Sequence, residues 1–352
     1  MTTPAALVTG ATGFIGSALV AALVAEGWTV RGAGRRPRPP EMSPEVDYRV
    51  VDLAEPGGRD RPGDLDGAVR GVSHVFHLAG ASSSLSSVPE MQRANGYATR
   101  RLVAALGPGG VQRLVHMSSS SVYGEREQLP VPVVEDVVPR PSRAYGQAKW
   151  DAEQAARGAA RAGVEVVVLR PVSVFGPGNV KLLASAILDV AIEGYAGWRR
   201  LEVPARPVEQ RLVHIDDVVG ACLHLARHPA AAGRAFNLVA PEYPSSHRIA
   251  EMLATEWGME AERSDDPGCG MDHTRRVQWR ARMLAEGMRP DILLTEERFR
   301  FMRKANPNNR LSTEALASTG FRFGAGDLAA SIGRTVTWYL DNRWVLPRPA
   351  TV

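Results

Sequence analysis

Tyr145 and Lys149 have the residue types and the spacing to carry out proton transfer. They stand four apart in an alanine-rich stretch that predicts a helix, so their side chains share one helix face. A tyrosine has an ordinary pKa near ~10, too high for a base at neutral pH, but a neighbouring ammonium group favours the phenolate and lowers this pKa. A serine hydroxyl from residues 118–121 could hold a substrate oxygen and stabilise charge on it. The pattern predicts acid–base chemistry at a carbon that bears a hydroxyl or keto oxygen.

The start of the chain predicts a binding site for the cofactor that such chemistry needs. An apolar strand over residues 5–9 enters three glycines spaced three apart, and an alanine-rich helix follows over residues 17–27. Gly10 permits a sharp exit from the strand, Gly13 leaves room for a phosphate beside the backbone, and Gly16 lets the helix pack close to the sheet. The first helix amides and the helix dipole then face a pyrophosphate. A glycine trio alone is a weak signal, but between a strand and a helix it predicts a dinucleotide site.

The end of the second predicted strand, residues 28–34, bears on which dinucleotide binds. In NAD-binding sheets of this kind an acidic residue there accepts hydrogen bonds from the ribose hydroxyls. Gly34 stands in that place, and Arg35 and Arg36 follow it. Guanidinium groups match a 2′-phosphate better than a free hydroxyl, so we favour NADP(H) and keep NAD(H) as the alternative. In a second interpretation, Arg35 and Arg36 belong only to a solvated loop.

Strands and helices alternate up to residue 171 with no hairpin signal, which predicts a parallel sheet wound on both sides. Further strands are expected at residues 48–53, 73–80, 111–117 and 164–170. Asp52, at the end of the first of these, either contacts an adenine amino group or begins a turn. The serine-rich segment 82–87 follows a strand end and is expected on the substrate side.

The second half of the chain does not continue the regular alternation of strands and helices. Residues 197–207 look irregular, and strands are expected at 211–217 and 234–239. Helical spacing occurs at residues 180–195, 245–258, 275–287 and 326–342. We predict a dinucleotide-binding domain over residues 1–171, whose sheet is completed by parts of 211–240. Residues 172–210 and 241–352 are expected to form a smaller mixed α/β lobe that binds the substrate.

Composition argues against several other classes of protein. The chain of 352 residues is 44% apolar and 23% charged, and its net charge of +4 comes from scattered arginines, which suits small anions better than a nucleic-acid duplex. Cys222 and Cys269 are far apart and no histidine has ligand spacing, so we expect free thiols in a reducing compartment and no metal. We find no signal peptide, and the longest apolar stretch, within residues 17–25, is too short to span a bilayer. A cytoplasmic protein without nucleic-acid or membrane contacts is expected.

Taken together, the motifs resemble the extended short-chain dehydrogenase/reductases of the NAD-dependent epimerase/dehydratase family. The matching segments cover roughly residues 5–240. They are Gly10-x-x-Gly13-x-x-Gly16, Asp52-Leu53, His77-Leu78-Ala79-Gly80, Asn95, Ser-Ser-Ser-Val-Tyr-Gly at 119–124, Tyr145-x-x-x-Lys149, Leu169-Arg170-Pro171, Phe175-Gly176-Pro177-Gly178, Val213-His214-Ile215-Asp216-Asp217 and Phe236-Asn237. The resemblance implies a Rossmann-type sheet, hydride transfer on a nucleotide-sugar or similar substrate, and a homodimer.

The resemblance also implies site residues. The catalytic residues would be Ser119, Tyr145 and Lys149. The cofactor would be bound by Gly10, Thr12, Gly13, Phe14, Ile15, Gly16, Arg35, Arg36, Asp52, Leu53, Leu78, Ala79, Gly80 and Asn95, together with Tyr145 and Lys149. Predicted substrate contacts are Ser82, Ser120, Ser121, Ser173 and Arg211.

Three departures from the family pattern restrict the reaction and the substrate. Ser120 and Ser121 replace the acidic pair of nucleotide-sugar 4,6-dehydratases, so no carboxylic acid is present there to protonate a leaving hydroxyl. Ser173 stands where many nucleotide-sugar members have asparagine. The arginine that often pairs with the diphosphate aligns with Gln210, and Arg211 lies one place later, on the opposite face of a strand.

Two reaction modes remain open at this point. In a redox-neutral mode the cofactor takes a hydride and returns it, as in epimerisation; in a net mode NADPH reduces a ketone. The family resemblance favours the first mode, and Arg35 with Arg36 favours the second. A non-catalytic dinucleotide sensor should lack Tyr145 and Lys149, and both are present. The arginine-rich segment 269–310 is either a solvated surface or a lid over an anionic substrate.

Overall fold

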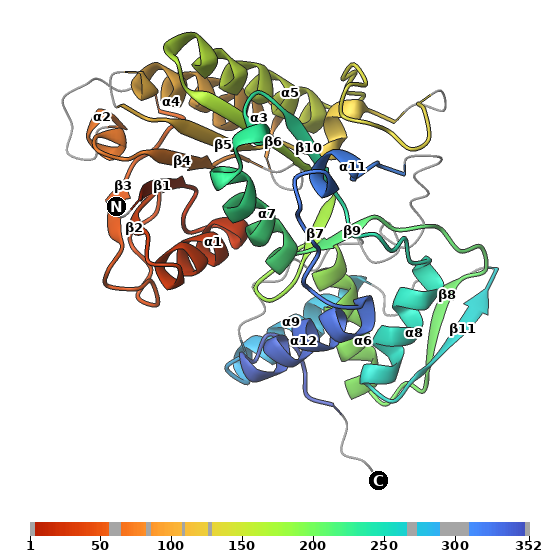
Figure 1. The fold of residues 1–352 in the computed structure, drawn as a ribbon. Coiled ribbons are helices and arrows are strands. Elements are labelled where there is room, and N and C mark those ends of the chain that lie inside the picture. Colours follow the sequence, from red (N-terminus) through yellow and green to blue (C-terminus); the bar gives the residue numbers. More distant parts are fainter. Residues whose placement is uncertain are drawn as a thin grey trace. The chain divides into compact units, whose positions relative to one another are not determined.

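The computed structural model describes residues 4–55, 65–81, 86–107, 110–125, 129–265, 273–288 and 310–348 (Figure 1). The chain divides into two compact units, each described here by itself. Unit 1 comprises Met1–Val172, Asp216–Val239 and Asn308–Gly324, and unit 2 comprises Ser173–Ile215, Ala240–Pro307 and Ala325–Val352. The predicted lobe ran without a break through residues 241–352, whereas Asn308–Gly324 clusters with unit 1.

Unit 1 is built on a parallel sheet of seven strands, in the order β10-β6-β5-β4-β1-β2-β3. The strands are β1 (Ala5–Thr9), β2 (Thr29–Gly34), β3 (Asp47–Val50), β4 (His74–His77), β5 (Arg113–Met117), β6 (Glu165–Pro171) and β10 (Ala235–Leu238). All residues of β5 and of β10 are buried, as expected for strands covered on both faces. The predicted doubly wound α/β fold is confirmed.

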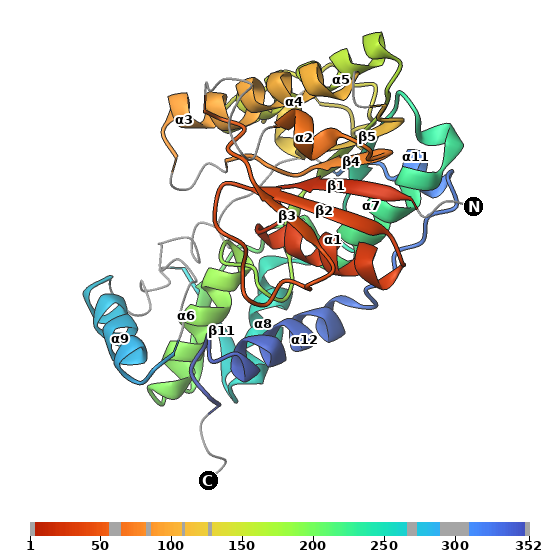
Figure 2. The same ribbon diagram turned by 90° about the vertical axis from the view of Figure 1, so that its left-hand side faces the viewer.

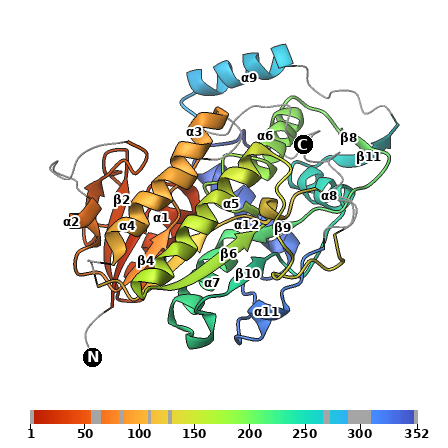
Figure 3. The ribbon, with the colours of Figure 1, turned by 90° about the horizontal axis from the view of Figure 1, so that it is seen from above.

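Helices cover both faces of this sheet. The helices of unit 1 are α1 (Phe14–Ala25), α2 (Leu65–Val69), α3 (Val88–Gln92), α4 (Ala98–Leu106), α5 (Ala144–Arg157), α7 (Ile215–Arg227) and α11 (Glu314–Ala317). Helices α2, α4 and α5 lie on one face and α1 and α7 on the other (Figures 1 and 2). Helices α4 and α5 lie side by side (Figure 3). The predicted helix over residues 90–106 is interrupted by a π-helical turn, η1 (Arg93–Tyr97).

Unit 2 is mixed α/β. It holds α6 (Leu183–Tyr195), α8 (Ser246–Glu256), α9 (His273–Ala285), α12 (Leu328–Asp341) and two parallel strand pairs, β7 (Ser173–Phe175) with β9 (Leu212–His214) and β8 (Arg200–Pro204) with β11 (Glu260–Ser264). Its core surrounds α6, which is buried along nearly its whole length. The expectation that residues 197–207 are irregular was wrong, because β8 forms there by pairing with β11, some sixty residues later. In the part of the chain that the structure describes, no helix combines the length and apolar composition needed to cross a bilayer.

Candidate active site

The three glycines after β1 each meet a different steric demand. Gly10 has φ +71°, and a Cβ added to it would come within 2.8 Å of the Ala79 amide nitrogen. A Cβ on Gly16 would lie 2.0 Å from the Gly10 carbonyl oxygen, so α1 can approach the turn only without a side chain there. Gly13 is exposed, precedes the first residue of α1 and has no acidic residue in the turn that follows it. The start of a helix with no acidic side chain in its first turn fits a pyrophosphate.

The other strand ends predicted to bind the cofactor lie next to this turn. The ends of β1 and β4 are tied together, because the Leu78 amide donates to the Thr9 carbonyl at 3.2 Å and the Ala79 amide to the Thr9 hydroxyl at 3.3 Å. Arg36 donates from Nη2 to the Thr12 carbonyl at 2.9 Å, and Arg35 is exposed beside it. Three further predicted contacts are partly exposed on the turn and the start of α1: Thr12, Phe14 and Ile15.

Asp52 lies just past the end of β3. Its Oδ1 accepts a hydrogen bond from the Ala54 amide at 2.8 Å, while Arg101 of α4 donates to the carbonyls of Asp52 and Leu53 at 3.2 and 3.1 Å. The strand ends at Val50, three residues before its predicted end, because Asp52 already begins a turn. Of the two roles predicted for Asp52, the geometry shows the turn. Contact with an adenine amino group stays a prediction.

Asn95 lies within the π-helical turn η1, a kind of turn that is frequent at functional sites. Its Nδ2 donates to the carbonyls of Met91 and Ala81 at 2.8 and 3.1 Å. No described residue is hydrogen-bonded to its buried Oδ1, which faces Gly80, where an added Cβ would come within 2.5 Å of it. Residue 80 therefore has to be glycine for Asn95 to lie as it does.

A chain of buried hydrogen bonds connects Asn95 with the end of β1. The Thr9 hydroxyl lies 2.7 Å from His77 Nδ1, His77 Nε2 lies 2.9 Å from the Thr99 hydroxyl, and that hydroxyl donates to the Asn95 carbonyl at 2.8 Å. Burial lowers the pKa of His77 to about 3, so the imidazole is neutral. Because Thr99 uses its proton on Asn95, His77 Nε2 carries the hydrogen and Nδ1 accepts from Thr9. These hydrogen bonds thus tie the π-helical turn at Asn95 to the end of β1, and in each of them the donor and the acceptor are fixed.

The three predicted catalytic residues gather where β5 ends. Tyr145 and Lys149 lie on one face of α5, as predicted, and the Ser119 hydroxyl is near enough to the Tyr145 phenol to lower its pKa. Lys149 is buried, and its Nζ donates to the Met117 carbonyl at 2.5 Å. The Tyr145 residue is partly exposed overall, while its phenol end is enclosed by protein. A substrate oxygen could therefore reach the phenol and the serine hydroxyl together.

The acidities differ from the expectation. Burial raises the pKa of Tyr145 above its ordinary value, and the hydrogen bond with Ser119 lowers it by less. Burial also lowers the pKa of Lys149 to about 8, with Glu153 acting in the opposite direction. The net shift of the Tyr145 pKa is therefore opposite to the one predicted, because burial of the phenol has the largest effect on it. At neutral pH this site holds a protonated phenol and a protonated lysine.

Glu153 supports this site from one turn further along α5, and sequence reasoning missed it. Its fully buried carboxylate accepts from Arg170 at 2.7 and 3.1 Å, from Arg157 at 3.0 and 3.2 Å and from the Ser118 hydroxyl at 2.9 Å. Burial alone would raise the pKa of Glu153, but these donors hold it below its ordinary value. The signal was available, since Glu153 follows Lys149 by four residues and so continues the face that carries Tyr145.

Arg170 extends the network to the neighbouring elements. Its Nη1 donates to the Tyr123 hydroxyl at 2.8 Å and to the Glu135 carbonyl at 2.9 Å. The Tyr123 hydroxyl donates to Asn237 Oδ1 at 2.7 Å, and the backbone amide of Asn237 donates to the Glu135 carboxylate at 2.7 Å. These bonds join α5, β6 and β10 to the 3₁₀ turn that follows Ser119. They give the motif residues Arg170 and Asn237 a positioning role that their spacing alone did not indicate.

The predicted substrate contacts are distributed over both units. Ser121 is exposed and donates from its backbone amide to the Ser119 hydroxyl at 3.2 Å; Ser120 is partly exposed beside it. Ser173 and Arg211 belong to unit 2, where Ser173 begins β7 and Arg211 directly precedes β9, the strand paired with β7. Arg211 is partly exposed and Gln210 is buried, as expected for neighbours on opposite faces. Ser82 and most of the segment 269–310 lie outside the described residues.

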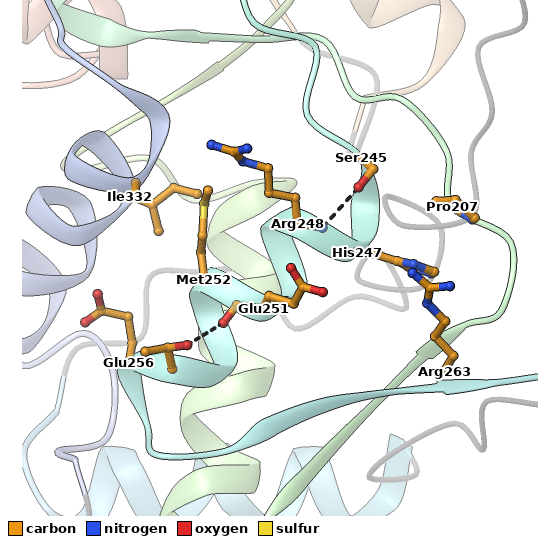
Figure 4. Close-up of a pocket in the computed structure, with 11 residues that line it drawn as sticks. Pro207, Ser245, His247, Arg248, Glu251, Met252, Glu256, Arg263 and Ile332 are labelled. Carbon is orange, nitrogen blue, oxygen red and sulfur yellow. Dashed lines mark hydrogen bonds between the residues drawn. The ribbon is translucent and has the colours of Figure 1, made fainter.

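Unit 2 also has an open groove of about 670 Å³ beside α8, which the sequence did not indicate (Figure 4). Eleven residues line it: Pro207, Ser245, His247, Arg248, Glu251, Met252, Thr255, Glu256, Arg263, Ala329 and Ile332. Its charged groups are of both signs, and two are paired at its edge, Arg248 with Glu242 at 3.2 Å and Glu256 with Arg348 at 2.5 Å. Over the described ranges no three His, Cys, Asp or Glu side chains gather to hold a metal ion.

The chain belongs to the NAD dependent epimerase/dehydratase family, whose model matches residues 6–238. It is an enzyme of the extended short-chain dehydrogenase/reductase type, as its motifs had indicated. The glycine turn, the exposed Gly13 and the buried Oδ1 of Asn95 fit the nicotinamide dinucleotide of this family.

Several characterised proteins are similar to this chain. A 4-hydroxy-2-methyl-3-oxo-4-farnesyl-3,4-dihydroquinoline-1-oxide ketoreductase of Stigmatella aurantiaca is 32% identical over 51% of this chain and 53% of its own length. A GDP-6-deoxy-D-mannose reductase of Pseudomonas aeruginosa is 29% identical over 82% of this chain and 93% of its own. The structure of MoeE5 in complex with UDP-glucuronic acid and NAD is 26% identical, with a TM-score of 0.69 over 96% of this chain and 99% of that one. The chain spans about half the length of the first curated relatives that it matches.

Proposed function

We propose that this chain is an NADP(H)-dependent reductase that converts a keto group of a small sugar-like or anionic substrate into a hydroxyl. The observation that carries the proposal is that Tyr145 and Lys149 share one face of α5 at the end of β5, where Lys149 Nζ donates to the Met117 carbonyl and Ser119 follows two residues later. Because burial keeps the Tyr145 phenol protonated at neutral pH, it has a proton to give, which reduction of a carbonyl requires. Ser120 and Ser121, in place of an acidic pair, argue against dehydration.

In this proposal the chain supplies proton transfer and charge stabilisation. Ser119 donates a hydrogen bond to the carbonyl oxygen, and Tyr145 transfers its phenol proton to the same oxygen. The Lys149 ammonium stabilises the phenolate that remains until it is protonated again. When bound, NADPH supplies the hydride that the carbonyl carbon accepts. Glu153, through Ser118 and Arg170, keeps α5 and the end of β5 in register for these steps.

Redox-neutral epimerisation is the second candidate. It is supported by the similarity to MoeE5, whose structure holds UDP-glucuronic acid and NAD. Gln210 and Ser173 stand against a nucleotide-sugar substrate, since both depart from the pattern of such enzymes. Net reduction is supported further by the arginines after β2 and by relatives that are named as reductases.

Purified full-length protein separates the two candidates. We would identify any nicotinamide released on denaturation, and then follow the fluorescence of added NADPH with a panel of small ketones. Stoichiometric loss of NADPH with reduction of a ketone is the expected result. Isomerisation of UDP-glucuronic acid without added nicotinamide, together with a retained NAD, would contradict net reduction and support epimerisation.

A further inference from the structure

Tyr48 of β3 covers the face of β2 that leads to the predicted cofactor site. Gly32 and Gly34 alternate along β2 and so share one face, and Tyr48 pairs in register with Gly32. A Cβ added to Gly32 would lie 3.2 Å from Tyr48 Cδ2, and one added to Gly34 would lie 2.7 Å from the Tyr48 hydroxyl oxygen. The tyrosine ring therefore occupies the space that side chains at both glycines would need.

The hydroxyl of Tyr48 is fixed at the strand end. It donates to the Arg36 carbonyl at 2.6 Å and lies beside the Thr12 hydroxyl. Arg36 in turn donates to the Thr12 carbonyl at 2.9 Å, so the turn after β2 is joined to the glycine turn after β1. Tyr48 is thus bonded to the backbone carbonyl of Arg36, while the guanidinium of Arg36 lies at Thr12.

An acidic side chain at the end of β2 is what a site for NAD uses to bind the ribose hydroxyls. At position 34 the Cβ of such a side chain alone would stand 2.7 Å from the Tyr48 hydroxyl oxygen, so the side chain fits only if the phenol leaves its place and its bond with the Arg36 carbonyl. The phenol in that place carries no negative charge, whereas a carboxylate would repel a 2′-phosphate. The neighbouring arginines can then act on a phosphate without an acidic competitor.

We propose that Tyr48 is a specificity-determining residue, which excludes the carboxylate needed for NAD(H) and so leaves the strand end to a 2′-phosphorylated cofactor. The inference deepens the proposed NADP(H) dependence and rests on it. A residue that only fills the space over Gly32 and Gly34 would affect the stability of the fold. The proposed role of Tyr48 affects in addition the relative affinity for NADPH and NADH.

The test compares Gly34→Asp, Tyr48→Ala and the double variant with the parent protein. Dissociation constants for NADPH and NADH would be measured by nicotinamide fluorescence on the full chain, and melting temperatures would be measured without ligand. Gly32→Ala is the matched control. It meets the same ring two residues earlier, so it should lower the melting temperature and leave the ratio of the two dissociation constants unchanged.

We expect the parent to bind NADPH tighter than NADH by on the order of tenfold or more, as for one charge-assisted contact. Gly34→Asp alone should weaken NADPH binding with no gain for NADH. Adding Tyr48→Ala should then tighten NADH binding on the order of tenfold. An equal gain for NADH in Gly34→Asp alone, or none in the double variant, would overturn the role of Tyr48.

The same measurements separate this inference from the proposed function. A parent protein that prefers NADH would refute NADP(H) dependence, and with it the proposed selectivity, while the two Gly34→Asp variants would still report whether Tyr48 blocks the position. A parent that binds neither dinucleotide would refute the proposed oxidoreductase function as a whole.

Discussion

The polar network under α5 in unit 1 and the groove beside α8 in unit 2 are both rich in charged groups, yet they differ in how these are held. In the network, Glu153 and Arg170 are almost fully buried, and each is bound by several partners. In the groove, Arg248 is largely exposed and Arg263 is exposed as well. A buried charge needs fixed partners, whereas an exposed one is satisfied by water. The difference implies that the charged side chains of the network are held in fixed positions and that those of the groove are not.

Replacing the phenol of Tyr145, which shares the α5 face with Glu153, should have the largest effect. Tyr145→Phe removes the proposed acid and should lower kcat by about 10²- to 10⁴-fold, the usual contribution of a positioned acid. The measurement is NADPH consumption with whichever ketone proves to be a substrate. Tyr195→Phe is the control, since Tyr195 packs by its ring against Trp279 in unit 2. Unchanged kcat in Tyr145→Phe would remove Tyr145 from its proposed role.

Glu153→Gln should have the next largest effect, on stability. It leaves the Arg170 guanidinium buried without its anion, so the free energy of unfolding should fall by about 3–5 kcal/mol. The matched control is Glu262→Gln, which breaks the exposed pair with Arg200 and should cost about 0–1 kcal/mol. Denaturant unfolding measures both. Equal losses in the two variants would contradict the distinction between a buried network and exposed pairs.

The pH dependence tests whether the lysine charge is used. Because burial lowers the pKa of Lys149 to about 8, its charge is present below that pH and is lost above it. Reduction should therefore slow as pH rises through about 8. The free energy of unfolding should not fall over the same pH range. An unfolded lysine keeps its proton up to a pH of ~10.4, so the contribution of Lys149 to stability rises with pH over this interval. A rate that stays constant from pH 7 to 9 while the melting temperature is unchanged would show that the charge of Lys149 is dispensable.

The sequence predicted most of unit 1 because its motifs encode steric and hydrogen-bonding demands that are local. Gly13 and Gly16 are required by contacts within a turn only a few residues long, and Tyr145 and Lys149 share one helix face. The role of Tyr48 was out of reach, because it depends on which strand lies beside β2. The raised pKa of Tyr145 depends likewise on burial by distant segments.

Unit 2 was less predictable for the same reason. Strand β8 pairs with β11 from some sixty residues away. Its polar and apolar residues alternate, but over only five residues, and β11 has no apolar face that would mark it as a strand. In unit 1 the π-helical turn at Asn95 was not predicted either; there the Asn95 side chain donates to the carbonyls of Met91 and Ala81. A site that depends on pairing between distant segments leaves little trace in the residue types of either one.

The smallest expected effect comes from the groove and completes the comparison. Arg263 lies on its rim in β11, exposed and close to His247 (Figure 4). Because water already satisfies the guanidinium, Arg263→Ala should change the free energy of unfolding by no more than about 0.5 kcal/mol and leave kcat/KM unchanged. Arg170→Ala, which empties the buried end of the network, is the contrasting variant. A loss of kcat/KM in Arg263→Ala as large as that in Tyr145→Phe would place the groove within the reacting site, and burial would then fail as the criterion that separates the two regions.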